Sequence, residues 1–144
     1  MKIPNNHTSA EQSKKLDRLH LELREWQSNL YFMLDEIIFI DRLLNSYAFQ
    51  PNTPNLFERI QDYLYRLKKA KEKRAAYVKL IGMHENDLGG MLECTDENCD
   101  LQYYQKHNAI KAEIAGCTQT FQELKSEIFN YAGGILKKKK PKAK

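Results

Sequence analysis

Long hydrophobic runs and cysteines are the first things that this sequence lacks. Its longest unbroken apolar runs, residues 30–34 and 37–40, are far shorter than the ~20 residues that a membrane-spanning helix needs. The first nine residues are polar and include Pro4, and no apolar segment typical of a secretory signal follows them. The cysteines number three, an odd count that does not fit a disulfide framework. We therefore expect a cytoplasmic protein with reduced cysteines and no transmembrane segment.

Motifs for catalysis and cofactor binding are missing as well. The six glycines form no phosphate-binding loop, and the sequence contains neither a nucleophile elbow nor a His-Glu-x-x-His pair. The Glu-x-x-His pairs that mark di-iron helical bundles are also absent. We therefore expect a non-enzymatic protein that needs no cofactor.

An excess of positive charge is confined to the end of the chain. The formal net charge is +4, yet residues 137–144 hold six lysines and no acidic residue. The rest of the chain carries 17 basic against 19 acidic residues. The sequence therefore predicts a nearly neutral body followed by a disordered lysine-rich tail over residues 137–144.

The sequence does contain three stretches in which apolar residues recur at alternating spacings of three and four. Each stretch lasts about 30 residues, which is typical of long packed helices. The second stripe, over residues 56–88, is interrupted by Arg74 and His84, and the third, over 103–135, by His107. The pattern predicts an all-α fold, an antiparallel up-down-up bundle of three long helices with coiled-coil-like heptads. The first stripe consists of Leu16, Leu19, Leu23, Trp26, Leu30, Met33, Ile37, Ile40, Leu44 and Tyr47.

Capping residues, prolines and glycines predict where the helices begin and end. A capping box from Thr8 to Glu11 starts the first helix, Thr53-Pro54 or Asn55 with Glu58 starts the second, and paired glycines stop the second and the third. We expect a flexible lead-in over residues 1–7 and one bundle over residues 8–136. The expected helices span about residues 9–48, 54–88 and 96–133.

The first helix carries more apolar surface than two neighbouring helices are expected to cover. Its additional apolar residues lie at positions that a three-helix bundle usually leaves exposed to water, and such a surface is typical of a contact site. We expect it to bind a second copy, since two-fold dimers dominate soluble oligomers, or another helical protein. The alternative is that a rotated or bent helix, or residues 89–99, covers it from within. The expected contact residues are Tyr31, Phe32, Leu34, Ile38 and Phe39.

Lysines gather in the middle of the second expected helix and in the tail. Clustered lysines neutralise phosphates, so they favour weak contact with nucleic acid or anionic lipid. No zinc-finger, RNP or helix-turn-helix signature accompanies them. The alternative is a solvated face and a solubilising tail. The candidate anion-binding residues are Lys68, Lys69, Lys71, Lys73, Lys137, Lys138, Lys139 and Lys140.

Histidines and a cysteine are expected to meet near one end of the bundle. Counting along the stripes places His20 level with His84. One alignment of the third helix adds His107, and another adds Cys99 and Asp100 instead. Metals do bind between facing helices of bundles, but a histidine on a core stripe is more often a packing residue. The candidate metal ligands are therefore His20, His84, His107 and Cys99.

Arg74 is the one arginine on an apolar stripe. Its stem is long enough to lie along apolar surface while the guanidinium reaches the edge of the core. We expect it to reach a flanking carboxylate, Glu36 or Glu113.

Overall fold

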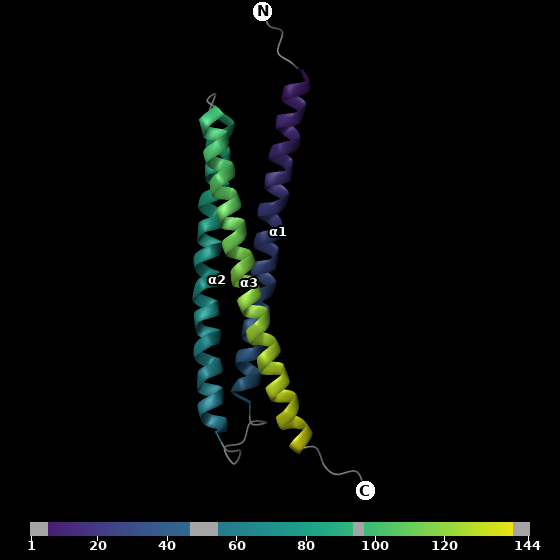
Figure 1. Cartoon of the computed structure of the whole chain (residues 1–144), viewed down its shortest axis with the longest axis vertical. Helices are drawn as coiled ribbons and strands as arrows, with labels where there is room; N and C mark the ends of the chain where they lie inside the picture. The colour runs from purple at the N-terminus through teal and green to yellow at the C-terminus, as the bar shows by residue number, and fades with distance from the viewer. Residues whose placement is uncertain (1–5, 47–54, 94–96, 140–144) are drawn as a thin grey trace, which may run out of the picture.

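The structure, a computed structural model, contains three long helices and no strand in the part of the chain that it describes (Figure 1). The helices are α1 (Asn6–Leu44), α2 (Leu56–Glu93) and α3 (Glu97–Lys139). The predicted all-α fold is confirmed. The described residues are 6–46, 55–93 and 97–139.

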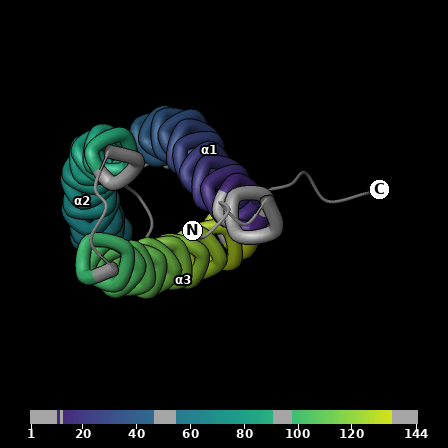
Figure 2. The backbone as a smooth tube through the Cα atoms, turned by 90° about the horizontal axis from the view of Figure 1, so that it is seen from above, coloured from purple at the N-terminus to yellow at the C-terminus, as the bar shows by residue number. Residues whose placement is uncertain are grey.

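The three helices pack together as one elongated bundle. Seen from above, the helices form a rough triangle, with α2 at one corner and α1 and α3 along the two sides that meet near it (Figure 2). In side view α1 and α3 cross (Figure 1), and the closest backbone packing is between α2 and each of the other two helices. One side of α1 therefore faces its two neighbours, and the opposite side faces away from them.

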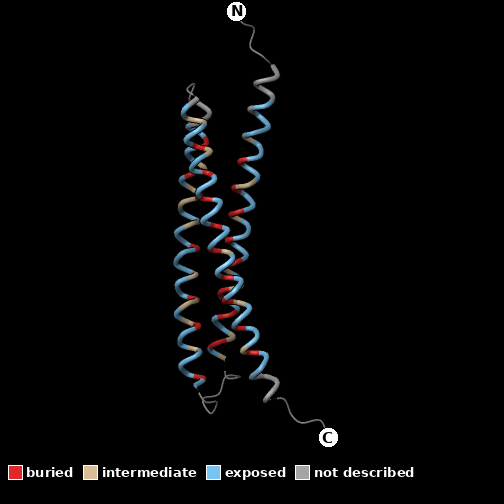
Figure 3. Tube along the Cα trace, viewed as in Figure 1, coloured by how far each residue is buried: buried red, intermediate tan, exposed pale blue. Residues whose placement is uncertain are grey.

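The buried residues form a single line along each helix (Figure 3). Of the ten residues in the first stripe, eight are buried, Leu16 is half-buried and Tyr47 lies outside the described residues. The stripes of α2 and α3 are buried or half-buried at every position whose burial the structure describes. Apolar periodicity thus predicted which face of each helix forms the core.

The first helix ends earlier than expected, at Leu44 rather than near residue 48. The backbone nitrogen of Asn45 and its side-chain Nδ2 both donate to the carbonyl of Asp41, at 3.1 and 2.8 Å. Ser46 donates its backbone N–H to the carbonyl of Leu43 at 3.1 Å, a tighter turn than the α-helical one. These bonds satisfy carbonyls at the end of the helix, so the chain leaves it there.

The second helix begins directly after Asn55. The carbonyl of Asn55 accepts the first helical hydrogen bond, from the backbone nitrogen of Arg59, at 3.1 Å. Asn55 has a φ of 60°, a left-handed conformation that asparagine tolerates better than most residues. The other expected start, Thr53-Pro54, lies outside the described residues.

Two of the expected helix ends are wrong because paired glycines do not stop the helices. Helix α2 continues through Gly89 and Gly90 to Glu93, and α3 continues through Gly133 and Gly134 to Lys139. No glycine has a positive φ among the described residues, so none forms a left-handed C-terminal cap. Glycine weakens a helix by about 1 kcal/mol relative to alanine, which a long packed helix tolerates.

At both ends of the chain, a helix extends into a segment that the sequence predicted to be irregular. Asn6 and His7 belong to α1, although residues 1–7 were expected to form a lead-in. Lys137, Lys138 and Lys139 belong to α3, so the lysine-rich tail begins within a helix. Lys140 and the residues after it lie outside the described part of the chain. Of the helices that the structure describes, none combines the length and the apolar character that crossing a membrane requires.

Candidate functional site

The outward side of α1 carries a group of exposed aromatic and aliphatic side chains. Tyr31, Phe32, Phe39 and Ile38 have exposed fractions of 72%, 64%, 59% and 37%. We call these four residues the aromatic face. Leu34, which the sequence also assigned to a contact site, is only half-buried, so its neighbours in the bundle cover part of it.

The aromatic face is exposed because α1 is apolar on two opposite sides over residues 30–40. Leu30, Met33, Ile37 and Ile40 are buried on the side that faces the other helices. Helices α2 and α3 both lie to one side of α1 (Figure 2), and the rings of Tyr31, Phe32 and Phe39 stay largely exposed. The alternative expectation, that the fold covers these rings from within, is wrong for this part of the chain.

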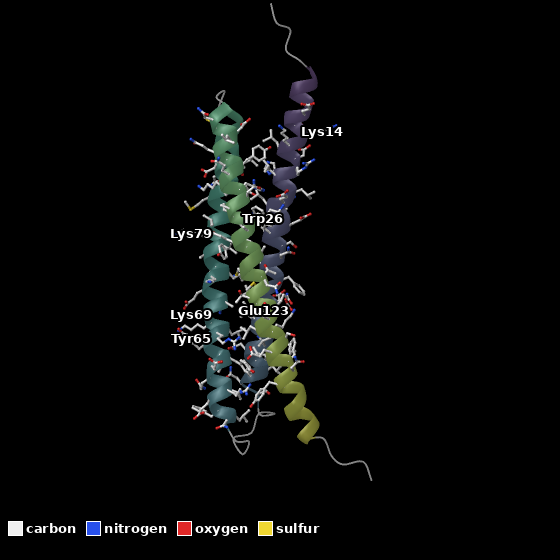
Figure 4. All side chains as sticks on the ribbon, in the orientation of Figure 1. Lys14, Trp26, Tyr65, Lys69, Lys79 and Glu123 are labelled. Carbon is white, nitrogen blue, oxygen red and sulfur yellow. The ribbon has the colours of Figure 1, made fainter. Side chains whose placement is uncertain are left out.

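The lysines of α2 do not form one patch. Lys68 and Lys71 border a groove of about 390 Å³ beside α1 that also includes Ile38 and Arg42. Lys69, together with Lys73, instead borders the groove between α2 and α3. Lys69 lies 5.4 Å from the centre of the Tyr65 ring and 3.7 Å from Glu72, and Figure 4 shows Lys69 and Tyr65 on the outer side of α2. The four lysines are therefore divided between two grooves, with two lysines beside each.

The groove between α2 and α3 has a volume of about 420 Å³. Its floor includes Cys117, a buried free thiol, and burial raises the pKa of that thiol. A raised pKa keeps the sulfur protonated near neutral pH and makes it a poor nucleophile. The opposite edge carries Arg66, whose guanidinium donates to the Glu127 carboxylate at 2.7 Å and lowers the pKa of Glu127.

Two histidines lie side by side in the core and are joined to a carboxylate. His84 on α2 is buried, and its Nε2 lies 3.0 Å from Nδ1 of His107 on α3. Nε2 of His107 lies 2.8 Å from a carboxylate oxygen of Glu22 on α1. Because a carboxylate only accepts, His107 Nε2 carries a hydrogen and donates it. We call His84, His107 and Glu22 the histidine cluster, and it joins all three helices.

Aromatic rings enclose the histidine cluster. The ring of His84 stacks on Tyr103 with centroids 4.1 Å apart, and Trp26 lies 4.6 Å from the ring of His107. Figure 4 shows Trp26 between α1 and α3. The hydroxyl of Tyr103 donates to the backbone carbonyl of His84 at 3.1 Å, and burial raises the pKa of Tyr103. These rings pack around two imidazoles that are almost fully buried.

Burial keeps His84 neutral. Desolvation, followed by the charges of His107 and Lys106, lowers the pKa of His84 to about 4, although Asp87 acts in the opposite direction. Nδ1 of His84 has no hydrogen-bond partner among the described residues. Since His107 donates from Nε2 to Glu22, its Nδ1 accepts a hydrogen bond from Nε2 of a neutral His84. Nδ1 of His84 then carries no hydrogen and is an acceptor without a donor. A second proton on His84 would lack a partner and would be buried as a charge.

The metal site that the sequence suggested does not form among the described residues. His84 and His107 come together, as one of the two expected alignments of the third helix required. His20 is exposed and takes no part in the cluster, because it follows Leu19 on the helix and points away from the buried stripe. Cys99 is disulfide-bonded, so its sulfur is not free to bind a metal, and the expectation of reduced cysteines is wrong at this position. No group of three potential ligands occurs in the described ranges.

Arg74 finds a partner that the sequence did not suggest. Its Nε donates to the backbone carbonyl of Leu30 at 2.6 Å, inside the core. The expected partner Glu36 instead accepts a hydrogen bond from Lys125. Because the carbonyl of Leu30 lies within hydrogen-bond distance inside the core, Nε of Arg74 is satisfied there without a carboxylate at the edge.

Sequence reasoning missed Glu22, the acidic member of the histidine cluster. Glu22 directly precedes the buried Leu23, and its position beside the stripe was the available signal. A comparison of the chain with protein-family models, curated proteins and solved structures found no match. The site must therefore be interpreted from its own chemistry.

Proposed function

We propose that this chain is a non-enzymatic interaction protein whose helical bundle presents the aromatic face of α1 to a second copy or to a partner protein. The observation that carries this proposal is the exposure of three aromatic rings and an isoleucine within nine residues of one helix. Contiguous exposed apolar surface marks sites of association, and aromatic residues supply much of the binding energy at such sites. A second copy is the simplest partner.

The proposal includes an antiparallel up-down-up bundle with coiled-coil-like heptads as the scaffold. Contacts between α2 and α3 support this topology, because Arg66 contacts Glu127 whereas Asp87 contacts Lys106. The residue numbers rise on α2 as they fall on α3. The contacts of α1 with α3, Glu22 with His107 and Glu36 with Lys125, rise together, as expected for two parallel outer helices.

Replacing two rings of the aromatic face with acids is expected to abolish self-association. In Phe32→Asp with Phe39→Asp, two desolvated carboxylates replace apolar contacts, so we expect the dimer dissociation constant to rise by about a hundredfold or more. Light scattering and sedimentation over a range of concentrations measure this change.

A matched control uses two exposed phenylalanines on the other helices. Phe57 and Phe129 are exposed on α2 and α3, so Phe57→Asp with Phe129→Asp introduces the same charge elsewhere. The control is expected to dimerise like the unsubstituted chain. An unsubstituted chain that stays monomeric at high concentration would exclude self-association and leave only a different partner protein.

A second candidate function is contact with an anionic polymer or membrane surface. Lys68, Lys71 and Lys73 are exposed, and none of the three has an ion-pair partner in the described part of the chain. Free cations of this kind bind phosphates with strong salt dependence.

This second function predicts binding that depends on the lysine tail. Removing residues 137–144 is expected to weaken binding to duplex DNA and to anionic vesicles, because six of the lysines are removed. Gel shift and vesicle co-sedimentation at two salt concentrations measure it. Binding that is equal with and without the tail, or insensitive to salt, would contradict the idea.

A further inference from the structure

The outward side of α1 carries a second stripe with the same alternating spacing as the core. All eight residues of this outer stripe are exposed. Their spacing of four and three residues is that of the a and d positions of a coiled coil. The outer stripe consists of Asp17, Leu21, Arg24, Ser28, Tyr31, Asp35, Ile38 and Arg42.

The outer stripe complements itself when it is read in reverse. Resting on the proposed self-association, we propose that two copies associate through an antiparallel pairing of their α1 helices about a two-fold axis between Asn29 and Leu30. Each a position then lies opposite a d position of the other copy, which is the layer geometry of an antiparallel coiled coil. The layers are Asp17 with Arg42, Leu21 with Ile38, Arg24 with Asp35, and Ser28 with Tyr31.

Charge complementarity identifies the second copy as the occupant of this face. Two of the four layers join an acid to an arginine, and the two-fold axis repeats each pair. Asp17, Arg24, Asp35 and Arg42 form no ion pair within the chain among the described residues. All four charges are therefore available to the partner copy.

Two pairs of residues beside the stripe, one on each side of it, favour this pairing. Positions that flank the layers on one side bring Arg18 near Phe39 of the other copy, where an arginine and an aromatic ring attract each other. On the other side His20 approaches Asp41. The side chains of Arg18, His20, Phe39 and Asp41 are all exposed.

Other pairings of the same face bring like charges together. A parallel pairing sets Arg24 against Arg24 and Asp35 against Asp35. An antiparallel pairing centred on Asp35 brings two carboxylates face to face on the axis. Like charges directly opposite each other are destabilising, so the charges select the alignment centred between Asn29 and Leu30.

Charge reversal tests the Arg24–Asp35 layer. Arg24→Glu alone, or Asp35→Arg alone, turns two attractions per dimer into repulsions, and each is expected to raise the dissociation constant about tenfold. The double variant with both changes restores the attraction with reversed signs and is expected to recover the original affinity. All positions are exposed, so circular dichroism is expected to show unchanged helix content. As a control, Lys79→Glu reverses an exposed charge on α2 (Figure 4) and is expected to leave the dissociation constant unchanged.

Distances between spin labels test the direction of the pairing. Labels on Ser28→Cys lie near the proposed axis and are expected to approach each other within about 20 Å. Labels on Ser13→Cys are expected to lie about 50 Å apart, since Ser13 of one copy lies level with residue 46 of the other and each residue adds 1.5 Å. A parallel pairing would instead bring both sets of labels close.

The outcomes separate this inference from the proposed function. A dimer that needs the aromatic face, but that the double charge reversal does not rescue or whose Ser13 labels lie close together, overturns the antiparallel pairing alone. A chain that is monomeric at every concentration overturns the pairing together with self-association. Rescue together with the long Ser13 distance supports both.

Discussion

Polar side chains inside an apolar core are the most informative feature at the scale of single residues. Arg74, His84 and His107 are buried among the described residues, and each meets a polar partner on another helix. Their places on the stripes were evident in the sequence, and so was the approach of His84 to His107 in one alignment. Their other partners, Glu22 for His107 and the carbonyl of Leu30 for Arg74, were not evident. Those contacts depend on how far a side chain reaches and how close two backbones lie, and the spacing of residues along the chain gives neither.

His84 predicts that the protein loses stability in mild acid. The pKa of His84 falls to about 4 in the fold from an unfolded value near 6.5, so the unfolded state takes up the proton first as the pH drops. The contribution of neutral His84 to the free energy of unfolding is therefore fully present above about pH 6.5 and is lost progressively towards pH 4. Between pH 7 and pH 5 we expect a loss of about 2 kcal/mol in the free energy of unfolding, measured by urea denaturation.

Two variants isolate this effect from other titrating groups. His84→Phe keeps a ring against Tyr103 but cannot take up a proton, so its stability is expected to change much less over the same pH range. His20→Gln removes an exposed histidine and is expected to keep the full dependence. If the free energy of unfolding fell equally steeply with pH in His84→Phe and in the unsubstituted chain, the acid sensitivity would not come from His84.

At the scale of the helices, burial was easier to predict than the helix ends. The apolar stripes identified the core because burial follows the repeated sum of many side chains. A helix end depends on a few local bonds, such as those that Asn45 and Ser46 donate to the last carbonyls of α1. The paired glycines, by contrast, end neither α2 nor α3. The contribution of packing along 38 residues of α2 outweighs the weak helix preference of two glycines.

Alanine at the paired glycines of α2 is expected to stabilise the protein. Gly89 and Gly90 lie within α2 at negative φ and are exposed, and an added Cβ would meet no atom of another helix within 4 Å. Gly89→Ala with Gly90→Ala is therefore expected to raise the free energy of unfolding by about 1–2 kcal/mol, as measured by urea denaturation. A loss of stability would mean that the glycines do end the helix in solution.

At the scale of the whole molecule, a three-helix arrangement leaves one outer side on every helix, and on α1 that side carries the exposed rings of the aromatic face together with the acids and arginines of the outer stripe. The sequence predicted the surplus of apolar residues at Tyr31, Phe32, Ile38 and Phe39. It did not indicate which charges would be free, because freedom from intramolecular ion pairs depends on where α2 and α3 lie. The alternation of acids and arginines along the outer stripe could nevertheless be found in the sequence of α1.

The histidine cluster also bears on how the chain avoids misfolding. If α3 settled two turns out of place along α2 so that Ile114 took the place of His107, His84 would face an aliphatic side chain. Ile114 offers no acceptor, so the buried imidazole would lose its only bond, and Glu22 would lose the imidazole that it accepts from. Such a misaligned bundle would still bury much apolar surface, but it would lose the hydrogen bonds of the histidine cluster. These three side chains therefore favour the correct alignment of the helices.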